Sequence, residues 1–147
     1  MFKSAQVIGV DISPTAIETC KKDVDSFVGN VKFIEADFFK TELGTFDLIF
    51  DHTFFCAINP QMRNVWGKRM ADLIAKDGHL LTIIYPLPLD PENVDKISGP
   101  PFEVTFSAYE TVLKGSFECV KKWSNENLPI SNEKRKGREE LVLWRHK

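Results

Sequence analysis

FDLIFDHTFFCAINP, residues 46–60, is the part of this 147-residue sequence that indicates its fold most clearly. Its first five residues form a short, almost wholly apolar run, which is typical of a strand covered on both faces in a mostly parallel sheet. The run ends at Asp51 and His52, and Pro60 suits the first turn of a following helix. Because ligands bind at the carboxyl ends of strands in open α/β sheets, the Asp51–His52 junction is the first candidate for a functional site.

Two apolar runs upstream of this stretch also end in acidic residues. Residues 7–11, VIGVD, end in Asp11, and the strand expected at residues 31–34 is soon followed by Asp37. The segment between them opens with a Ser-Pro pair, which suits a helix N-cap and first turn, and it reaches a helix stop near Gly29. The first third of the chain therefore predicts a strand, an amphipathic helix and a second strand.

The second half of the chain alternates between helical and extended patterns. Residues 86–101 carry five of the eight prolines, which favours a lid or binding loop over a tether. Residues 124–137 suit an exposed hairpin loop. The remaining elements are expected to be a helix over 60–75 stopped by 76–78, a strand over 79–85, a helix from Thr105 or Ser107 through Leu113, and strands over 117–123 and 140–144.

Helices that alternate with apolar strands predict a doubly wound α/β sheet that is mostly parallel and closes with an antiparallel pair. A parallel sheet ending in one antiparallel strand is the arrangement associated with S-adenosylmethionine-dependent methyltransferases. No internal repeat or linker divides the chain, so we expect residues 1–147 to form a single domain.

Composition excludes several classes of protein. Apolar residues make up 43% of the chain, and the net charge is −2 with basic residues spread along the sequence, which argues against a nucleic-acid surface. No apolar run approaches the roughly 20 residues that span a bilayer. We therefore expect a soluble, cytoplasmic protein with neither a nucleic-acid nor a membrane partner.

The cysteines indicate neither a metal site nor a disulfide framework. Cys20, Cys56 and Cys119 are far apart in the sequence and form no CxxC pair. Reduced and mostly buried thiols are expected, with no bound metal.

Six blocks of sequence together resemble one family. They are VIGVDISPTAIE, FIEADFF, FDLIFDHTFFCAINPQMRNVWGKRM, DGHLLTIIYPL, GPPFEVTFSAYE and GREELVLWR. In this order and at this spacing they resemble the plant and fungal thiol and halide methyltransferases, which are related to thiopurine S-methyltransferase. The resemblance extends over nearly the whole chain, and the DHTFFCAI block beside the GPPFEV block is its most specific part.

The resemblance implies a Rossmann-like class I methyltransferase fold with S-adenosylmethionine as the cofactor. In that family a first strand and a Gly-rich turn precede the strand expected here at residues 7–11. No G-x-G occurs among the eight glycines of this chain. We therefore expect a partial methyltransferase domain, corresponding to the carboxyl-terminal two-thirds of the fold and lacking the first strand and the Gly-rich turn.

The resemblance also implies cofactor-binding residues. Asp11 matches the family acid that accepts hydrogen bonds from the ribose hydroxyls, a role that suits a carboxylate. Asp37 and Phe38 match the positions beside the adenine, where a carboxylate accepts from the exocyclic amine and an aromatic ring covers the base. The alternatives are a helix-capping acid at Asp11, and a strand-end acid with a core phenylalanine at Asp37 and Phe38.

His52 matches the position where the family places a side chain against the bound cofactor, and its alternative is a histidine that caps a strand. Phe54, Phe55 and Phe102 are candidates for the aromatic walls of a dry acceptor pocket, and their alternative is ordinary core packing. No residue is assigned a catalytic role, because direct methyl transfer needs no enzyme nucleophile. Cys56 is expected to pack in the core.

The resemblance implies methyl transfer from S-adenosylmethionine to a small soft nucleophile, which could be a thiol, thiocyanate, bisulfide or a halide. A second function stays open, that of a catalytically inactive truncated remnant acting as a binding or regulatory module. A third, a nucleotide binder of the dehydrogenase type, is disfavoured because the phosphate-binding glycine fingerprint does not occur.

Overall fold

The computed structural model describes residues 5–24, 30–95, 97–124 and 133–147. Contacts within the chain group it into two compact units, unit 1 with residues Met1–Leu43 and unit 2 with residues Gly44–Lys147. The helix stop predicted near Gly29 lies outside the described residues, as does most of the loop predicted at 124–137.

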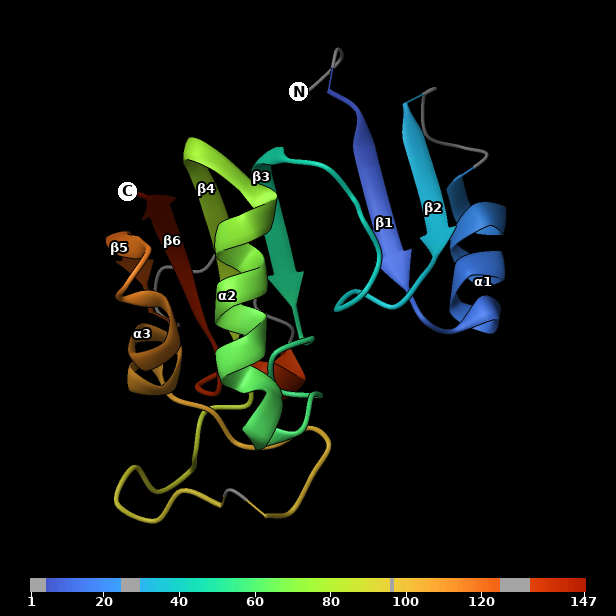
Figure 1. Ribbon diagram of the computed structural model, residues 1–147. Coiled ribbons are helices and arrows are strands. Elements are labelled where there is room, and N and C mark those ends of the chain that lie inside the picture. Colours follow the sequence, from blue (N-terminus) through green and yellow to red (C-terminus); the bar gives the residue numbers. More distant parts are fainter. Residues whose placement is uncertain (1–4, 25–29, 96, 125–132) are drawn as a thin grey trace. The chain divides into compact units, whose positions relative to one another are not determined.

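Unit 1 is a strand–helix–strand unit, as the sequence predicts. Its elements are β1 (Val7–Asp11), α1 (Pro14–Val24) and β2 (Val31–Glu35) (Figure 1). β1 and β2 pair in parallel, so that Asp11 lies opposite Glu35. Ile17 of α1 is buried, and it anchors the apolar side of the helix as the helical spacing predicts. The acids that end β1 and β2 therefore come to one edge of this two-stranded sheet.

Unit 2 is built on a four-stranded mixed sheet. Its strands are β3 (Phe46–His52), β4 (Ile74–Ile84), β5 (Phe117–Trp123) and β6 (Glu140–His146). They lie in the order β3-β4-β6-β5. β3 and β4 run parallel, and β6 runs antiparallel to both of its neighbours, β4 and β5. The strand that closes the sequence is thus an inner strand of the sheet, and the predicted α/β fold with a terminal antiparallel strand is confirmed.

Two helices lie side by side on one face of this sheet (Figure 1). They are α2 (Arg63–Leu73), preceded by the short 3-10 helix η1 (Pro60–Met62), and α3 (Phe106–Leu113). Asn59 is the N-cap of η1, and its Oδ1 accepts a hydrogen bond of 2.9 Å from Gln61 N. The Thr105 hydroxyl accepts from Ala108 N and caps α3, which confirms the predicted start of that helix.

The end of the helix predicted over 60–75 is wrong. α2 ends at Leu73, and Ile74 already begins β4, so that residues 76–78 belong to the strand and do not stop the helix. Ile74 is only 2% exposed and pairs with Phe46 of β3. Burial and strand pairing of Ile74 therefore override the local Lys-Asp-Gly signal. Asp77 has a φ of +63°, a left-handed conformation that aspartate tolerates better than most residues.

An aromatic cluster forms the centre of unit 2 between the sheet and the helices. Phe55, Trp66 and Tyr109 are fully buried, and the Phe55 ring centroid lies 4.7 Å from that of Trp66 and 4.0 Å from that of Tyr109. Such rings bury large apolar areas and dominate core energetics. The cluster joins the loop after β3 to both α2 and α3.

Close packing of α2 on α3 depends on Gly67. A Cβ at this position would lie 2.6 Å from the backbone oxygen of Val112. We expect Gly67→Ala to destabilise the chain by roughly 1–3 kcal/mol in urea unfolding, because a backbone oxygen can give way only if α3 moves. Gly115→Ala is the matched control, since a Cβ there meets nothing within 4 Å. Equal stability of the two variants would show that the helices are not in close contact at Gly67.

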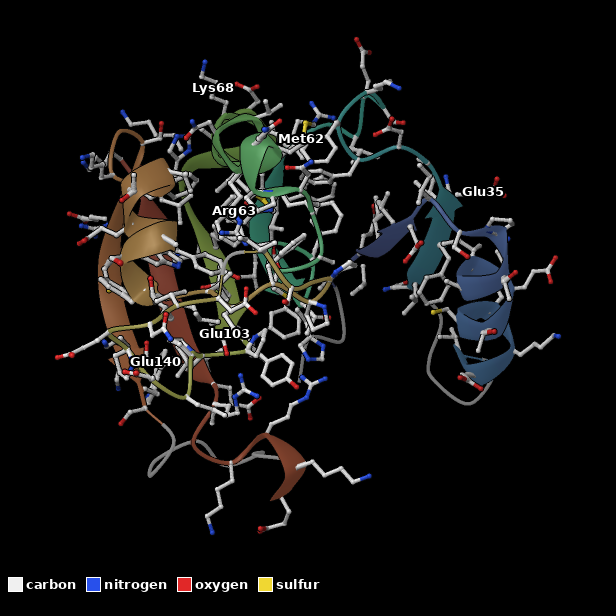
Figure 2. All side chains as sticks on the ribbon, turned by 90° about the horizontal axis from the view of Figure 1, so that it is seen from below. Glu35, Met62, Arg63, Lys68, Glu103 and Glu140 are labelled. Carbon is white, nitrogen blue, oxygen red and sulfur yellow. The ribbon has the colours of Figure 1, made fainter. Side chains whose placement is uncertain are left out.

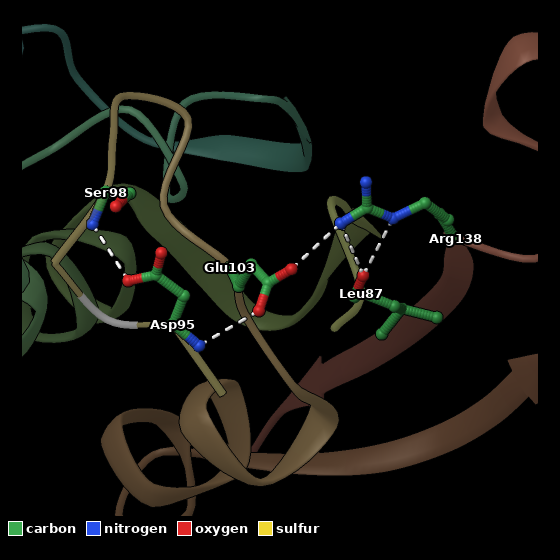
Figure 3. Close-up of polar contacts among 5 residues, drawn as sticks. All are labelled: Leu87, Asp95, Ser98, Glu103 and Arg138. Atoms are coloured by element: carbon green, nitrogen blue, oxygen red, sulfur yellow. Dashed lines mark hydrogen bonds and ion pairs between the residues drawn. The ribbon is translucent and has the colours of Figure 1, made fainter. Parts of the chain in front are cut away.

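Hydrogen bonds hold the proline-rich segment after β4 near its start, at Leu87, and again at Asp95 (Figure 3). Arg138 donates from Nε and Nη2 to the Leu87 carbonyl oxygen, each at 3.0 Å, and also pairs with Glu103 at 3.0 Å. The second Glu103 oxygen accepts from Asp95 N at 3.0 Å. Asp95 Oδ1 in turn accepts from Ser98 N at 2.9 Å. Residues of this segment thus share one polar network with Arg138, two residues before β6. The predicted lid function stays a prediction.

Among the described residues, no helix has both the length and the apolar character that crossing a membrane requires.

Candidate functional site

Three side chains from distant parts of unit 2 meet at the carboxyl ends of β3 and β4. Nη1 of Arg135 lies 3.0 Å from Nε2 of His52. The guanidinium carbon of Arg135 also lies 4.4 Å from the centroid of the Tyr85 ring, within the range of a cation–π contact. We call Arg135, His52 and Tyr85 the arginine site.

The sheet topology explains why these three residues meet. His52 ends β3 and lies opposite Ile83, while Tyr85 directly follows β4. β6 runs antiparallel to β4, so its first residue, Glu140, lies opposite Ile84 at the same edge. Arg135 ends the short 3-10 helix η3 (Glu133–Arg135), which precedes β6 and lies near the carboxyl end of β3 (Figure 1).

The arginine site carries a positive charge. Among the residues that the structure describes, no carboxylate forms an ion pair with Arg135. Burial, followed by the charge of Arg135, lowers the pKa of His52 from its usual 6.5, against an opposing effect of Glu139. The shift favours the neutral imidazole, whose Nε2 can accept the hydrogen bond from Arg135. The positive charge that can attract an anion to this site therefore comes from Arg135 and not from His52.

Asp51, one residue before His52, is buried and shapes the loop after β3. It is 3% exposed, and its Oδ1 accepts hydrogen bonds from Phe54 N at 3.1 Å and Phe55 N at 3.4 Å. Burial raises the pKa of Asp51 to about 6, although these two hydrogen bonds and the nearby Trp66 indole oppose the rise. Within the described residues, Asp51 Oδ2 has no hydrogen-bond partner of good geometry. Asp51 thus holds the turn that sets Phe54 and Phe55 in place.

The three phenylalanines predicted to line an acceptor pocket occupy different surroundings. Phe55 lies in the aromatic core, which fits the alternative of core packing. Phe54 and Phe102 are half-buried, and Phe102 N donates to the Cys56 carbonyl oxygen at 2.8 Å. The Phe102 ring packs so closely on Gly99 that a Cβ there would lie 2.5 Å from it. The GPPF segment therefore lies against the loop after β3, and the wall role of these residues stays a prediction.

Cys56 is buried, and its Sγ lies 3.3 Å from the Thr53 carbonyl oxygen. Burial, followed by the charge of Asp51, raises the pKa of the Cys56 thiol to about 11. A thiol that stays protonated at neutral pH is a poor nucleophile. The placement fits the expected core role of this residue.

The residues predicted to contact ribose and adenine lie in unit 1, whereas His52 and the predicted acceptor walls lie in unit 2. Asp11 is exposed at the end of β1, and its Oδ1 accepts from Ser13 N at 2.7 Å. Asp37 Oδ1 accepts from Phe39 N at 2.9 Å and its Oδ2 pairs with Lys40 at 3.0 Å; these contacts lower the pKa of Asp37. Both acids thus also serve local turns, and their cofactor roles, like that of the half-buried Phe38, stay predictions.

The sequence reasoning missed Arg135 and Tyr85. Arg135 belongs to the basic run KRKGR at residues 134–138, which was interpreted only as part of an exposed loop. Its position just before a block that resembles the methyltransferase family was the available signal. Tyr85 closes an apolar strand, where an aromatic residue carries no functional signal of its own.

In the described part of the chain, no three His, Cys, Asp or Glu side chains lie together in a way that could hold a metal ion.

Comparison with known proteins adds family information to this geometry. A family model described as thiopurine S-methyltransferase matches residues 3–147. Thiocyanate methyltransferase 1 of Brassica oleracea is 40% identical over 148 residues, which cover 95% of this chain and 59% of that protein. The chain therefore spans less than two-thirds of the length of this curated relative.

Two solved structures show the same fold. A SAM-dependent methyltransferase from Methanosarcina mazei matches with a TM-score of 0.74 at 15% identity, covering 96% of this chain and 82% of that one. N-methyltransferase NodS from Bradyrhizobium japonicum, in complex with S-adenosyl-L-homocysteine, matches with a TM-score of 0.67 at 16% identity, covering 96% and 66%. At such low identity the likeness extends to the fold alone, and it confirms the expected Rossmann-like class I methyltransferase fold.

Proposed function

This chain belongs to the thiopurine S-methyltransferase family, and from that membership we propose that it transfers a methyl group from S-adenosylmethionine to a small soft nucleophile. Thiols and thiocyanate are the first candidates, because the family name and the Brassica relative both refer to methylation of sulfur compounds. Bisulfide and halides share the same soft, anionic character and belong to the same proposal.

The observation that supports this proposal is the positive charge of the arginine site. Arg135 is fixed between His52 and the Tyr85 ring, and within the described residues no carboxylate forms an ion pair with it. A guanidinium that is already oriented binds an anion without first having to be ordered. A thiolate, thiocyanate or halide is an anion of suitable size for one guanidinium.

The chemistry needs little from the protein beyond position and charge. When bound, S-adenosylmethionine supplies an electrophilic methyl group, whose bond to the sulfonium sulfur breaks as the lone pair of the nucleophile forms the new bond. Arg135 would hold the nucleophile and favour the thiolate over the thiol, since a nearby cation lowers a thiol pKa. Correct alignment alone can lower such a barrier by roughly 7–11 kcal/mol. Neutral His52 keeps Arg135 in place and need not act as a base.

The acid at the end of β1 fits a contact with the cofactor. In the described part of the chain, Asp11 uses Oδ1 for the local turn, and no hydrogen bond to Oδ2 occurs. The free oxygen can accept from a ribose hydroxyl. Asp37 fits less well, because both of its oxygens already have partners. We therefore expect Asp11 to contribute more than Asp37 to cofactor binding.

Asp11→Ala should weaken binding of S-adenosylmethionine roughly tenfold to a hundredfold, which is the scale of hydrogen bonds to a charged group. Isothermal titration measures the affinity, and thermal unfolding checks that the melting temperature changes little. Ser13→Ala is the control, because it removes the hydroxyl that accepts from Ala16 N at the start of the same helix. A large fall in melting temperature with unchanged affinity would show that Asp11 only caps α1.

The proposed reaction is tested by incubating the purified chain with S-adenosylmethionine and one acceptor at a time. Mass spectrometry of S-adenosylhomocysteine and of the methylated product measures turnover. We expect turnover with thiocyanate, a small thiol, bisulfide or iodide, and none with an alcohol or a primary amine. Binding of S-adenosylmethionine without turnover of any soft anion would contradict the proposed reaction and favour the binding or regulatory module.

A further inference from the structure

A cavity of about 340 Å³ lies in unit 2, and none of its lining residues belongs to the arginine site. Its walls come from the N-terminal part of α3, from the proline-rich segment and from the first residue of α2. The lining residues that matter here are Arg63, Pro91, Val94, Glu103, Thr105 and Ala108. A cavity of this size is at the lower end of the range in which proteins bind small organic molecules.

Arg63 is the cavity residue with unused hydrogen-bonding capacity. Its guanidinium carbon lies 4.8 Å from the centroid of the Phe55 ring, so the group is held against the aromatic core. Two of its nitrogens, Nε and Nη2, are buried without a partner among the described residues. Nη1 is not among these buried nitrogens, and it donates no hydrogen bond in the described part of the chain. Figure 2 shows Arg63 inside unit 2, whereas Lys68 of the same helix projects outward.

The second charged residue of the cavity is already neutralised. Glu103 pairs with Arg138 through one carboxylate oxygen, and its other oxygen accepts from Asp95 N (Figure 3). Among the described residues, no carboxylate forms an ion pair with Arg63. The cavity therefore carries one uncompensated positive charge. Because the Glu103 carboxylate lines the same space, it disfavours a ligand with two negative charges.

We propose that this cavity binds a small organic monocarboxylate. Nη1 of Arg63, the guanidinium nitrogen that is not buried, can donate a charge-assisted hydrogen bond to a carboxylate. The Thr105 and Ser107 hydroxyls, 2.9 Å apart, offer further hydrogen bonds at the start of α3. Pro91 and Val94 provide apolar contacts for the body of such a molecule. The site does not depend on the proposed methyl transfer, because the two sites have no residue in common.

Binding is tested by titrating the full chain with 4-fluorobenzoate and following the fluorine NMR signal. We expect saturable binding in the low millimolar range, and no saturation with the neutral 4-fluorobenzamide or with inorganic phosphate. Arg63→Met should weaken 4-fluorobenzoate binding at least tenfold. Lys68→Met removes an exposed charge from the same helix and should leave the affinity unchanged.

Two further variants keep the proposal testable if Arg63→Met does not fold. Ala108→Leu fills the cavity from α3 while keeping Arg63, and it should also abolish saturable binding. Arg135→Met should leave binding intact. Loss of binding in Arg135→Met with retention in Ala108→Leu would place the probe at the arginine site and overturn the proposal. Equal binding of phosphate and 4-fluorobenzoate would overturn the assignment to monocarboxylates.

Discussion

Between pH 4 and pH 7, the free energy of unfolding of the wild type should fall by about 3 kcal/mol more than that of Asp51→Asn. Asp51 is buried at the end of β3, and burial raises its pKa from 3.8 to about 6 in the folded protein. Between these two values the folded chain holds a proton on this group that the unfolded chain has released. Stability from this residue is therefore fully present below about pH 4 and is lost as the pH rises through 6.

The measurement is urea unfolding of the wild type and of Asp51→Asn at several pH values. The free energy of unfolding of the wild type, minus that of the variant, should fall as the pH rises and level off above about pH 7. Taking this difference cancels the titration of all other groups. Asp47→Asn, which removes an exposed carboxylate from the same strand, controls for the loss of one charge. A constant difference across the range would show that folding does not raise the pKa of Asp51.

Arg135→Met should lower kcat/KM for an anionic acceptor roughly 10- to 150-fold, the scale of hydrogen bonds to a charged group. The physical reason is that Arg135 is the only group of the arginine site with a positive charge, since the pKa of His52 is lowered by burial and by Arg135 itself. Without the guanidinium, the nucleophile loses both its anchor and the charge that stabilises it. The KM for the acceptor should rise more than the KM for S-adenosylmethionine.

A pH profile separates this role from a merely structural one. With a thiol acceptor, loss of Arg135 should move the rising limb of kcat/KM to higher pH, because the thiolate is no longer favoured by a neighbouring cation. Arg135→Lys should restore part of the rate, whereas Lys136→Met, which removes an exposed charge next in the sequence, should behave like the wild type. If Arg135→Met raised the KM for thiocyanate and the KM for S-adenosylmethionine by the same factor, an acceptor-binding role would be contradicted.

Asp51 and Arg135 are linked through His52. Asp51 precedes His52 at the end of β3 and holds the following turn, where Thr53 has a φ of +66°. His52 in turn accepts the hydrogen bond that fixes Arg135. A buried acid thus supports the loop and strand end that position the charge proposed to bind the acceptor. We expect changes at Asp51 to affect turnover through this position and not through a contact with substrate.

The elements whose signals are local could be predicted from the sequence. The apolar run at 7–11, the Ser-Pro start of α1 and the cap at Thr105 each depend on a few neighbouring residues, and the structure confirms all three. The order of strands and helices was then sufficient to predict an α/β sheet with an antiparallel strand at the end of the chain. Residue type was a poorer guide to the cysteines, which were expected to be mostly buried because free cysteine is among the most buried residues. Cys56 is buried, but Cys20 and Cys119 are exposed, so that expectation is wrong for two of the three.

The remaining features depend on contacts between distant parts of the chain. The local pattern predicted that the helix ends at residues 76–78. In the structure β4 already begins at Ile74, which pairs with Phe46. Phe54 and Phe55 are alike in the sequence, yet only Phe55 lies in the aromatic core. Arg135 meets His52 across 83 residues, because the antiparallel register of β6 on β4 returns the chain to the carboxyl end of β3. Local propensity carries no information about such a contact, since it arises from strand register and side-chain packing, which depend on residues far apart in the chain.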